Sequence, residues 1–409
     1  MVPEGWNKKS LSDVTAVIDC KHRTPIYVEA GIPLVSPGTI RWGALDLVSP
    51  IKRVSKDEYE SLMDHCTIDI GDLVMSRNQS VGIASYIETD EPFVLGQDTV
   101  LIKPQKIDSK FVFYKLQSEV VQRSIIKLAG GSTFSRINLA DIRKLKFNVP
   151  PLPEQKKIAQ ILSTWDKAIT TTEQLLANSQ QQKKALMQQL LTGRKRLQDK
   201  NGARFSGEWQ MVKISSVCNV RRGASPRPIK DPKWFASDGR GWIRISDVTA
   251  SPTKELLNTT QYLSSAGADN SVCVDPGDLI MSICGTIGVP KVIGIHACIH
   301  DGFVVFRECQ ENLDLSFLYH YLGFITEKLA SGGQPGTQKN LNTGIVGNTL
   351  MPWVSKAEQQ KIATVLSTAD QEISALQQKL DALKQEKKAL MQQLLTGKRR
   401  VKVEGAGYV

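Results

Sequence analysis

The sequence contains no long hydrophobic run. No apolar stretch among its 409 residues approaches the roughly 20 residues that a membrane-spanning helix needs. The opening residues MVPEGW lack the charged and apolar regions of a signal peptide. Seven cysteines, an odd number with no C-x-x-C pair, do not make a disulfide framework. We therefore expect a protein of the reducing cytoplasm with no membrane partner.

Two motifs of enzymatic chemistry are also absent. An adenine methyltransferase holds the flipped base with an Asn/Asp-Pro-Pro-aromatic motif, and the nearest stretches, NVPP at 148–151 and DPKW at 231–234, both depart from it. The stretch GGQPGTQK at 332–339 has the wrong spacing for a Walker A loop. The chain is therefore predicted not to be an enzyme itself, which disfavours a self-contained methyltransferase.

Two smaller patterns have both a chemical and a structural interpretation. The acidic-x-Lys spacing of Glu154 and Lys156 occurs in some nucleases, but in the first turn of a helix it favours a solvated, dipole-matched face. His296, Cys298 and His300 alternate, so a strand would place all three on one face, where they could bind a metal. No fourth ligand lies nearby and a half-buried strand explains the same residues, so we predict no metal site.

What the sequence does contain is an internal duplication. Residues 154–193 and 358–397 align without a gap, and 24 of the 40 aligned positions are identical, including the shared ending KKALMQQLLTG. Each copy follows about 150 residues of different character, so the chain reads as head, long helix, head, long helix.

Both copies carry the heptad spacing of a helix that packs along another helix. At 1.5 Å per residue each would be roughly 60 Å long. One such helix is typical of a coiled coil that joins subunits, whereas two in one chain favour an antiparallel pair within the molecule, with the heads at opposite ends. The predicted packing residues are Ile158, Leu162, Trp165, Ile169, Leu176, Leu186 and Leu190 in the first copy and Ile362, Leu366, Ile373, Leu380, Leu390 and Leu394 in the second.

The row of packing positions along each helix, here called its seam, also contains one lysine. Antiparallel pairing of two equal helices places Lys183 near Asp370, and Lys387 near Asp166 and Trp165. We hypothesise that these pairs select the antiparallel register, as single polar core residues can.

The ends of the two copies are marked by capping residues. Prolines at 150, 151 and 153 precede the first copy, an S-x-x-E capping box at 355–358 starts the second, and Gly193 and Gly397 stop them. These signals divide the chain into a first head at 1–150, a first long helix at 151–193, a basic linker at 194–204, a second head at 205–353, a second long helix at 354–397 and a basic tail at 398–409.

The positive charge is not on the heads. The net charge is +11, yet residues 1–150 carry 19 basic against 18 acidic residues and residues 201–352 carry 14 against 13. The excess lies on the long helices and on the basic runs that follow them, 194–196 and 398–400, where cations suit the helix dipole. Any DNA binding by the heads would therefore depend on local patches and on a partner that adds phosphate contacts.

The two heads resemble each other more weakly. GDLVMS at 71–76 matches GDLIMS at 277–282, and in both a Gly-Asp turn leads into a short apolar strand. Short Val/Ile-rich strands with glycine turns, together with helical stretches near 109–128 and 312–330, predict two similar mixed α/β heads. The order of the strands cannot be traced from the sequence.

These features together resemble the DNA-specificity subunit of type I restriction-modification systems. The resemblance rests on PPLPEQKKIAQIL at the start of the first long helix, on the duplicated KKALMQQLLTG ending and on the GDLVMSR and GDLIMSI strands. The corresponding start of the second long helix, MPWVSKAEQQKIA, lacks the three prolines of the first.

The resemblance implies that each head reads one half of a bipartite DNA target and that the helices set the spacer. It also implies two modification subunits, which dock on the chain and supply S-adenosylmethionine binding and methylation, and restriction subunits, which use ATP and Mg²⁺. No cofactor is expected on this chain.

Polar residues in the irregular stretches of each head are the candidate DNA contacts, because these residue types bind phosphates and base edges. In the first head they are Lys21, His22, Arg23, Ser36, Arg41, Arg77, Asn78, Gln79, Ser135 and Arg136. In the second head they are Arg221, Arg222, Arg227, Arg244, Ser246, Asp247, Gln338, Lys339 and Asn340. Taken singly, each also fits a solvated turn residue.

A second interpretation belongs to another class. The near-neutral heads also fit a cytoplasmic coiled-coil scaffold that holds protein partners and binds no DNA. Salt-dependent DNA binding distinguishes the two interpretations.

Overall fold

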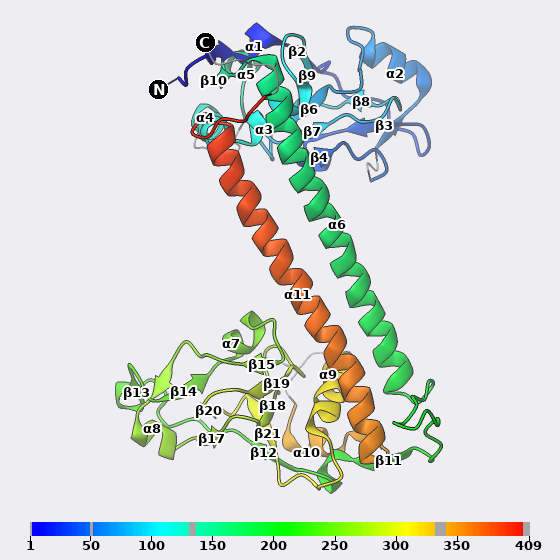
Figure 1. Ribbon diagram of the computed structural model, residues 1–409, viewed down its shortest axis with the longest axis vertical. Helices are drawn as coiled ribbons and strands as arrows, with labels where there is room; N and C mark the ends of the chain where they lie inside the picture. The colour runs from blue at the N-terminus through cyan, green and yellow to red at the C-terminus, as the bar shows by residue number, and fades with distance from the viewer. Residues whose placement is uncertain (1, 50–51, 131–135, 332–340, 404–409) are drawn as a thin grey trace. The chain divides into compact units, whose positions relative to one another are not determined.

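The computed structural model describes residues 2–49, 52–130, 136–331 and 341–403. It divides into two compact units, residues 1–171 with 380–409 and residues 172–379 (Figure 1). Each unit contains one head and parts of both long helices. The mixed α/β fold class predicted from the sequence is confirmed.

The first head is built on a five-stranded sheet of order β2-β9-β6-β7-β4, in which only β4 and β7 are parallel neighbours. Its strands are β2 (Thr15–Asp19), β9 (Thr99–Pro104), β6 (Leu73–Ser76), β7 (Ala84–Tyr86) and β4 (Gly43–Ala44). A smaller sheet contains β5 (Arg53–Val54), β3 (Ile32–Val35) and β8 (Val94–Leu95), and β1 (Asn7–Ser10) pairs with β10 (Lys146–Val149). The helices are α1 (Leu11–Val14), η1 (Pro37–Thr39), α2 (Lys56–Met63), α3 (Ser109–Gln117), α4 (Glu119–Leu128) and α5 (Leu139–Arg143).

The second head repeats this plan. Its main sheet has the order β12-β21-β18-β19-β15, and again only the last pair is parallel. Its strands are β12 (Asn219–Arg222), β21 (Phe303–Arg307), β18 (Leu279–Ser282), β19 (Pro290–Ile293) and β15 (Glu255–Leu256). A second sheet contains β13 (Phe235–Ala236), β16 (Tyr262–Leu263), β14 (Arg240–Ile243), β20 (Ala297–Ile299) and β17 (Val272–Val274), and β11 (Gln210–Lys213) pairs with β22 (Leu350–Trp353). The helices are η2 (Ile214–Ser216), η3 (Pro232–Trp234), α7 (Ile245–Ala250), α8 (Ser265–Asp269), α9 (Leu315–Ser331) and α10 (Thr343–Asn348).

The Gly-Asp turns seen in the sequence start the central strands β6 and β18. Gly71 and Gly277 have φ of +99° and +98°, a region that glycine adopts without steric cost. Every residue of both strands is buried. In β6, Leu73 and Met75 face one hydrophobic cluster and Val74 faces another, so the strand is apolar on both faces.

The duplicated segments form α6 (Leu152–Leu190) and α11 (Lys356–Leu394), each of 39 residues and each unbroken in Figure 1. In the first unit Ile158 and Leu162 of α6 share a hydrophobic cluster with Leu394 at the end of α11. In the second unit Ile362 of α11 shares a cluster with Leu190 at the end of α6. Within each unit the start of one helix therefore packs near the end of the other. All the predicted packing residues are buried or half-buried.

The two seam lysines bond the predicted carboxylates. Lys183 forms an ion pair with Asp370 in the second unit, and Lys387 forms one with Asp166 in the first. Lys387 also lies 5.4 Å from the centre of the Tyr114 ring on α3, so this pair contacts the head as well as the helices. That the pairs select the register remains a prediction.

The basic runs after the long helices have a structural role that the sequence did not indicate. In the first unit Arg400 bonds both oxygens of Glu154 at 2.7 and 2.8 Å, and Trp6 donates to the same carboxylate at 3.1 Å. In the second unit Arg196 bonds both oxygens of Glu358 at 2.6 and 2.8 Å. The expectation of a solvated helix face at Glu154 is wrong, because this residue is 4% exposed and its charge is paired.

We call these the two arginine clamps, Arg400 with Glu154 and Arg196 with Glu358. In each, the arginine follows one long helix and the carboxylate lies in the first turn of the other. The arginines also lie 5.8 Å and 5.7 Å from the ring centres of Trp6 and Trp209. The clamps therefore join helix ends to the tryptophan at the start of each head.

A buried lysine makes the stability of the first unit depend on pH. Lys115 on α3 is 5% exposed and donates to the carbonyl of Leu395, just past α11. Burial lowers its pKa from 10.5 to about 8. Between these values the unfolded chain binds more protons than the folded chain, so the free energy of unfolding rises with pH in this window. We expect a rise of roughly 2 kcal/mol between about pH 8 and pH 10.

Urea unfolding at both pH values measures this rise. The variant Lys115→Met removes the titrating group and should lose the rise, whereas Lys110→Met, on the half-exposed side of α3, should keep it. An equal rise in the Lys115→Met protein would contradict the assignment.

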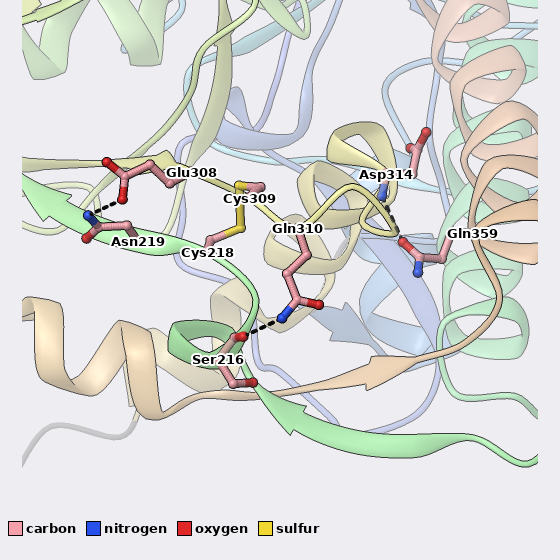
Figure 2. The surroundings of a disulfide bond; sticks show 8 residues. All are labelled: Ser216, Cys218, Asn219, Glu308, Cys309, Gln310, Asp314 and Gln359. Carbon is pink, nitrogen blue, oxygen red and sulfur yellow. Dashed lines mark hydrogen bonds between the residues drawn. A yellow bond between two sulfur atoms is a disulfide. The ribbon is translucent and has the colours of Figure 1, made fainter.

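Two expectations based on what the sequence lacks have different outcomes. Among the described residues, none of the helices combines the length and apolar character that crossing a membrane requires. The expected lack of disulfides needs correction, because Cys218 and Cys309 are bonded, with Cα atoms 4.1 Å apart (Figure 2). The two cysteines are 91 residues apart in sequence. They come together because they lie next to β12 and β21, which pair in the folded head.

Hydrogen bonds support the chain around this disulfide (Figure 2). Asn219 donates to Glu308 at 3.0 Å and Gln310 donates to the Ser216 carbonyl at 2.9 Å. Gln359 of α11 accepts from the Asp314 backbone N–H at 2.9 Å. The disulfide therefore sits where the sheet of the second head meets the turn that leads to α9.

Candidate nucleic-acid interface

Three loops of the first head meet where β2 and β6 end and β9 begins. We call this the first-head corner and define it as residues 19–23, 77–79 and 96–98 with Arg136. The Arg77 backbone N–H donates to the Asp98 carbonyl at 2.8 Å, and the Arg77 guanidinium bonds both oxygens of Asp19 at 2.7 and 2.8 Å. Arg136 forms an ion pair with Asp98 at 2.7 Å.

The second head has the equivalent corner, where β12 and β18 end and β21 begins. We define the second-head corner as residues 221–227, 244–246, 283–285 and 300–302. The Ile283 N–H donates to the Gly302 carbonyl at 2.8 Å. The Arg222 Nε donates to the Asp301 carbonyl at 2.7 Å, and the Ser225 hydroxyl donates to Asp301 Oδ1 at 2.8 Å. Because the main sheets have the same strand order, the two corners occupy the same place in the two heads.

Several residues of the first head that were predicted to contact DNA bond other residues of the protein instead. Arg77 is 5% exposed and also donates to the Ile137 carbonyl at 3.2 Å. Arg23 bonds both oxygens of Glu58 at 2.6 and 3.0 Å, and Lys21 bonds Asp64 at 2.7 Å. Arg77 was predicted as a DNA contact, but its burial and its pair with Asp19 make it a residue that positions the corner.

The other predicted residues of the first head differ in exposure. His22, Arg41, Gln79 and Arg136 are exposed, whereas Ser36 and Asn78 are half-buried. Gln79 has a positive φ of 57° and its side chain reaches the turn at Gly38, so the segment 36–41 borders the corner. Ser135 lies outside the described residues.

In the second head the arginines are exposed and the acidic residue is not. Arg221, Arg222, Arg227, Arg244 and Ser246 are exposed. Asp247 is 7% exposed and accepts from the Arg244 backbone N–H at 2.9 Å and the Thr260 hydroxyl at 2.8 Å, so its role as a DNA contact needs correction. The predicted residues Gln338, Lys339 and Asn340 lie outside the described residues.

A cavity of about 550 Å³ opens at the second-head corner. Residues with different chemistry line it, among them Ser225, Arg227, Trp242, Arg244, His300 and Asp301. The Gly302 N–H donates to His300 Nδ1 at 2.9 Å, so the neutral ring carries its proton on Nε2. Burial lowers the pKa of His300, which keeps the ring neutral. The cavity therefore combines a carboxylate, two guanidinium groups and a neutral imidazole.

The carboxylate of this cavity stays ionised. Burial opposes ionisation of Asp301, but hydrogen bonds from the Ser225 hydroxyl and from the backbone N–H of Asp301, with a smaller contribution from the positive charge of Arg227, outweigh it and lower the pKa of Asp301. Asp301 accepts from Ser225 through Oδ1 and lies 3.4 Å from Arg227 NH2 through Oδ2.

Among the residues that the structure describes, one group, in the first head, has ligand atoms close enough together to hold a metal ion. The ligand atoms of Asp19, Cys20 and His22 lie within 4.8 Å of one another. Both oxygens of Asp19 already bond Arg77, and Cys20 is buried with a pKa raised by burial. This arrangement therefore fits a structural ion pair better than a metal site. Of the alternating residues His296, Cys298 and His300, the first histidine bonds Asp275 at 2.7 Å and the last accepts from the Gly302 backbone N–H.

The acidic partners at both corners were not predicted from the sequence. Asp19, Asp98 and Asp301 were not among the candidate residues. Asp98 and Asp301 lie in the turns before the equivalent strands β9 and β21, and only the strand order of the folded heads shows that these turns correspond.

The comparisons with known proteins agree on a family. The pattern of the type I restriction modification DNA specificity domain matches residues 3–178 and 206–385. The putative type I restriction enzyme MjaX specificity subunit of Methanocaldococcus jannaschii is 26% identical and covers 98% of this chain and 95% of its own length. The type I restriction enzyme EcoKI specificity subunit of Escherichia coli is 24% identical over 69% of this chain and 62% of its own length.

Solved structures give the same fold. The S subunit of the type I restriction-modification system of M. genitalium has a TM-score of 0.62, at 14% identity and with 96% of each chain covered. A chain from a study of the assembly and conformational transition of a type I R-M system has a TM-score of 0.59 at 18% identity, covering 98% of this chain and 100% of that one. Since the family pattern spans both heads and most of both long helices, this chain belongs to the type I restriction modification DNA specificity domain family.

Proposed function

We propose that this chain is the sequence-specific DNA-binding subunit of a type I restriction-modification complex and that each head reads one half of a bipartite target. One observation carries the proposal: two heads of the same strand order carry different side chains at the same corner. At the positions after β6 and β18 that are not buried, the first head has Asn78 and Gln79, whereas the second has Cys284 and Gly285. Equivalent loops with different chemistry suit two readers of different sequences.

The partners follow from the family and from the long helices. Two modification subunits would dock on this chain and bind S-adenosylmethionine, and restriction subunits would bind ATP and Mg²⁺. This chain would contribute the DNA contacts and, through α6 and α11, the spacing between half-sites. A scaffold without DNA binding is not favoured, because the family pattern covers both heads.

The affinity for DNA should depend strongly on salt. Phosphate contacts release counterions, so we expect the affinity of the chain with its modification subunits to fall at least roughly tenfold between 50 and 200 mM salt. Gel shift with random-sequence duplexes measures the non-specific affinity, and selection from a randomised duplex pool identifies the target. Salt-independent binding, or no binding at all, would contradict the proposed function.

A further inference from the structure

In the second-head corner an arginine and an aspartate stand side by side with their functional groups facing solvent. Arg227 NH2 lies 3.4 Å from Asp301 Oδ2, and the two side chains are 72% and 42% exposed. Asp301 is held from the other side, since its Oδ1 accepts from Ser225 and its carbonyl accepts from Arg222. The carboxylate is therefore fixed, while Arg227 is held only by a long, exposed pair, which is worth little.

This pair matches the edge of one base pair. In the major groove a G·C pair presents the guanine N7 and O6 acceptors beside the cytosine N4 donor. A guanidinium supplies two donors in a fork, and an adjacent carboxylate supplies an acceptor. An A·T pair instead presents a donor between two acceptors and a methyl group, which this arrangement does not match.

We propose that Arg227 and Asp301 together read one G·C base pair of the second half-site, with Arg227 on guanine N7 and O6 and Asp301 on cytosine N4. This inference rests on the proposed function. On binding, Arg227 exchanges its weak contact with Asp301 for a bidentate contact with guanine, and the freed Oδ2 accepts from cytosine.

The other arginines of the corner are less suited to this role. Arg222 is bonded through Nε to the Asp301 carbonyl, and Arg244 bonds Gln261 at 2.7 Å. Arg221 is exposed on β12 and does not line the cavity. Only Arg227 stands next to the ionised carboxylate.

The experiment is a binding selection with the full chain and its modification subunits on duplexes randomised in the second half-site. In Arg227→Gln the amide prefers adenine N6 and N7, so one position should change from guanine to adenine or lose its preference, by roughly 5- to 150-fold. Asp301→Asn should weaken the preference at that same position. Arg240→Gln is the matched control: it removes an arginine–aspartate pair of the same head that lies outside the corner, and it should leave every base preference unchanged.

The outcomes separate the inference from the proposed function. If both variants bind DNA with unchanged preferences at every position of the second half-site, the reading of a G·C pair is wrong while DNA recognition stands. If the wild-type complex selects no sequence, the proposed function itself fails. Should Arg227→Gln not fold, Arg227→Lys keeps the charge without the fork, and an unaltered guanine preference in that variant would also overturn the inference.

Discussion

Replacing residues 1–150 with the first head of another family member should change one half of the DNA target and leave the other half and the spacer unaltered. The hydrophobic clusters explain why we expect this independence. The first head packs around clusters that contain Phe111 and Phe93, and the second around clusters that contain Phe317 and Ile280. Each of these clusters lies within one of the two units. Methylome sequencing of cells that express the chimera with its modification subunit measures the target.

The contacts between the first head and the helices set the conditions for this exchange. Trp6 bonds Glu154, Lys115 bonds the Leu395 carbonyl, and the Asp108 N–H donates to Gln155 at 2.8 Å. If the head taken from the other family member has the same residues at these positions, the buried hydrogen-bonding groups of the helices keep their partners.

The matched control is the exchange of residues 205–353, which should change the other half of the target. A first-head chimera that folds but recognises a target altered in both halves would contradict separate reading by the two heads.

Removing Arg196 should cost the second unit about 3 kcal/mol of unfolding free energy. Arg196→Ala would leave the side chain of Glu358, which is 2% exposed, without its bidentate partner. It would also remove the contact with Trp209 and the hydrogen bond from NH1 to the Gly207 carbonyl at 2.8 Å. Urea unfolding followed by circular dichroism measures the loss.

Arg194→Ala is the matched control, since this arginine is exposed two residues earlier and should change stability by less than about 0.5 kcal/mol. A double-mutant cycle with Glu358→Ala isolates the pair, and we expect a coupling of roughly 2 kcal/mol. Equal effects of Arg194→Ala and Arg196→Ala would show that only general positive charge near the helix end matters.

The candidate DNA contacts show which features of a site residue type alone can predict. Residue type and loop position selected Arg227, Arg244 and Arg222, which the fold places at one corner of the second head. The same criteria selected Arg77, which is buried against Asp19, 58 residues away in sequence. Whether an arginine is available to contact DNA depends on whether the folded chain brings a carboxylate next to it. The residue type alone does not reveal this.

The sequence by itself determined the duplication, the two long helices with their packing residues, the pairing of Lys183 with Asp370 and of Lys387 with Asp166, and the mixed α/β class of the heads. These depend on periodicity and on the equal length of the two helices, which are properties of local sequence. The tertiary structure alone decided the strand order of the heads, the two arginine clamps, the Cys218–Cys309 bond and the placement of Arg227 beside Asp301. Each of these joins residues far apart in the chain, and such partners are fixed by how strands and helix ends come together, not by the sequence around either residue.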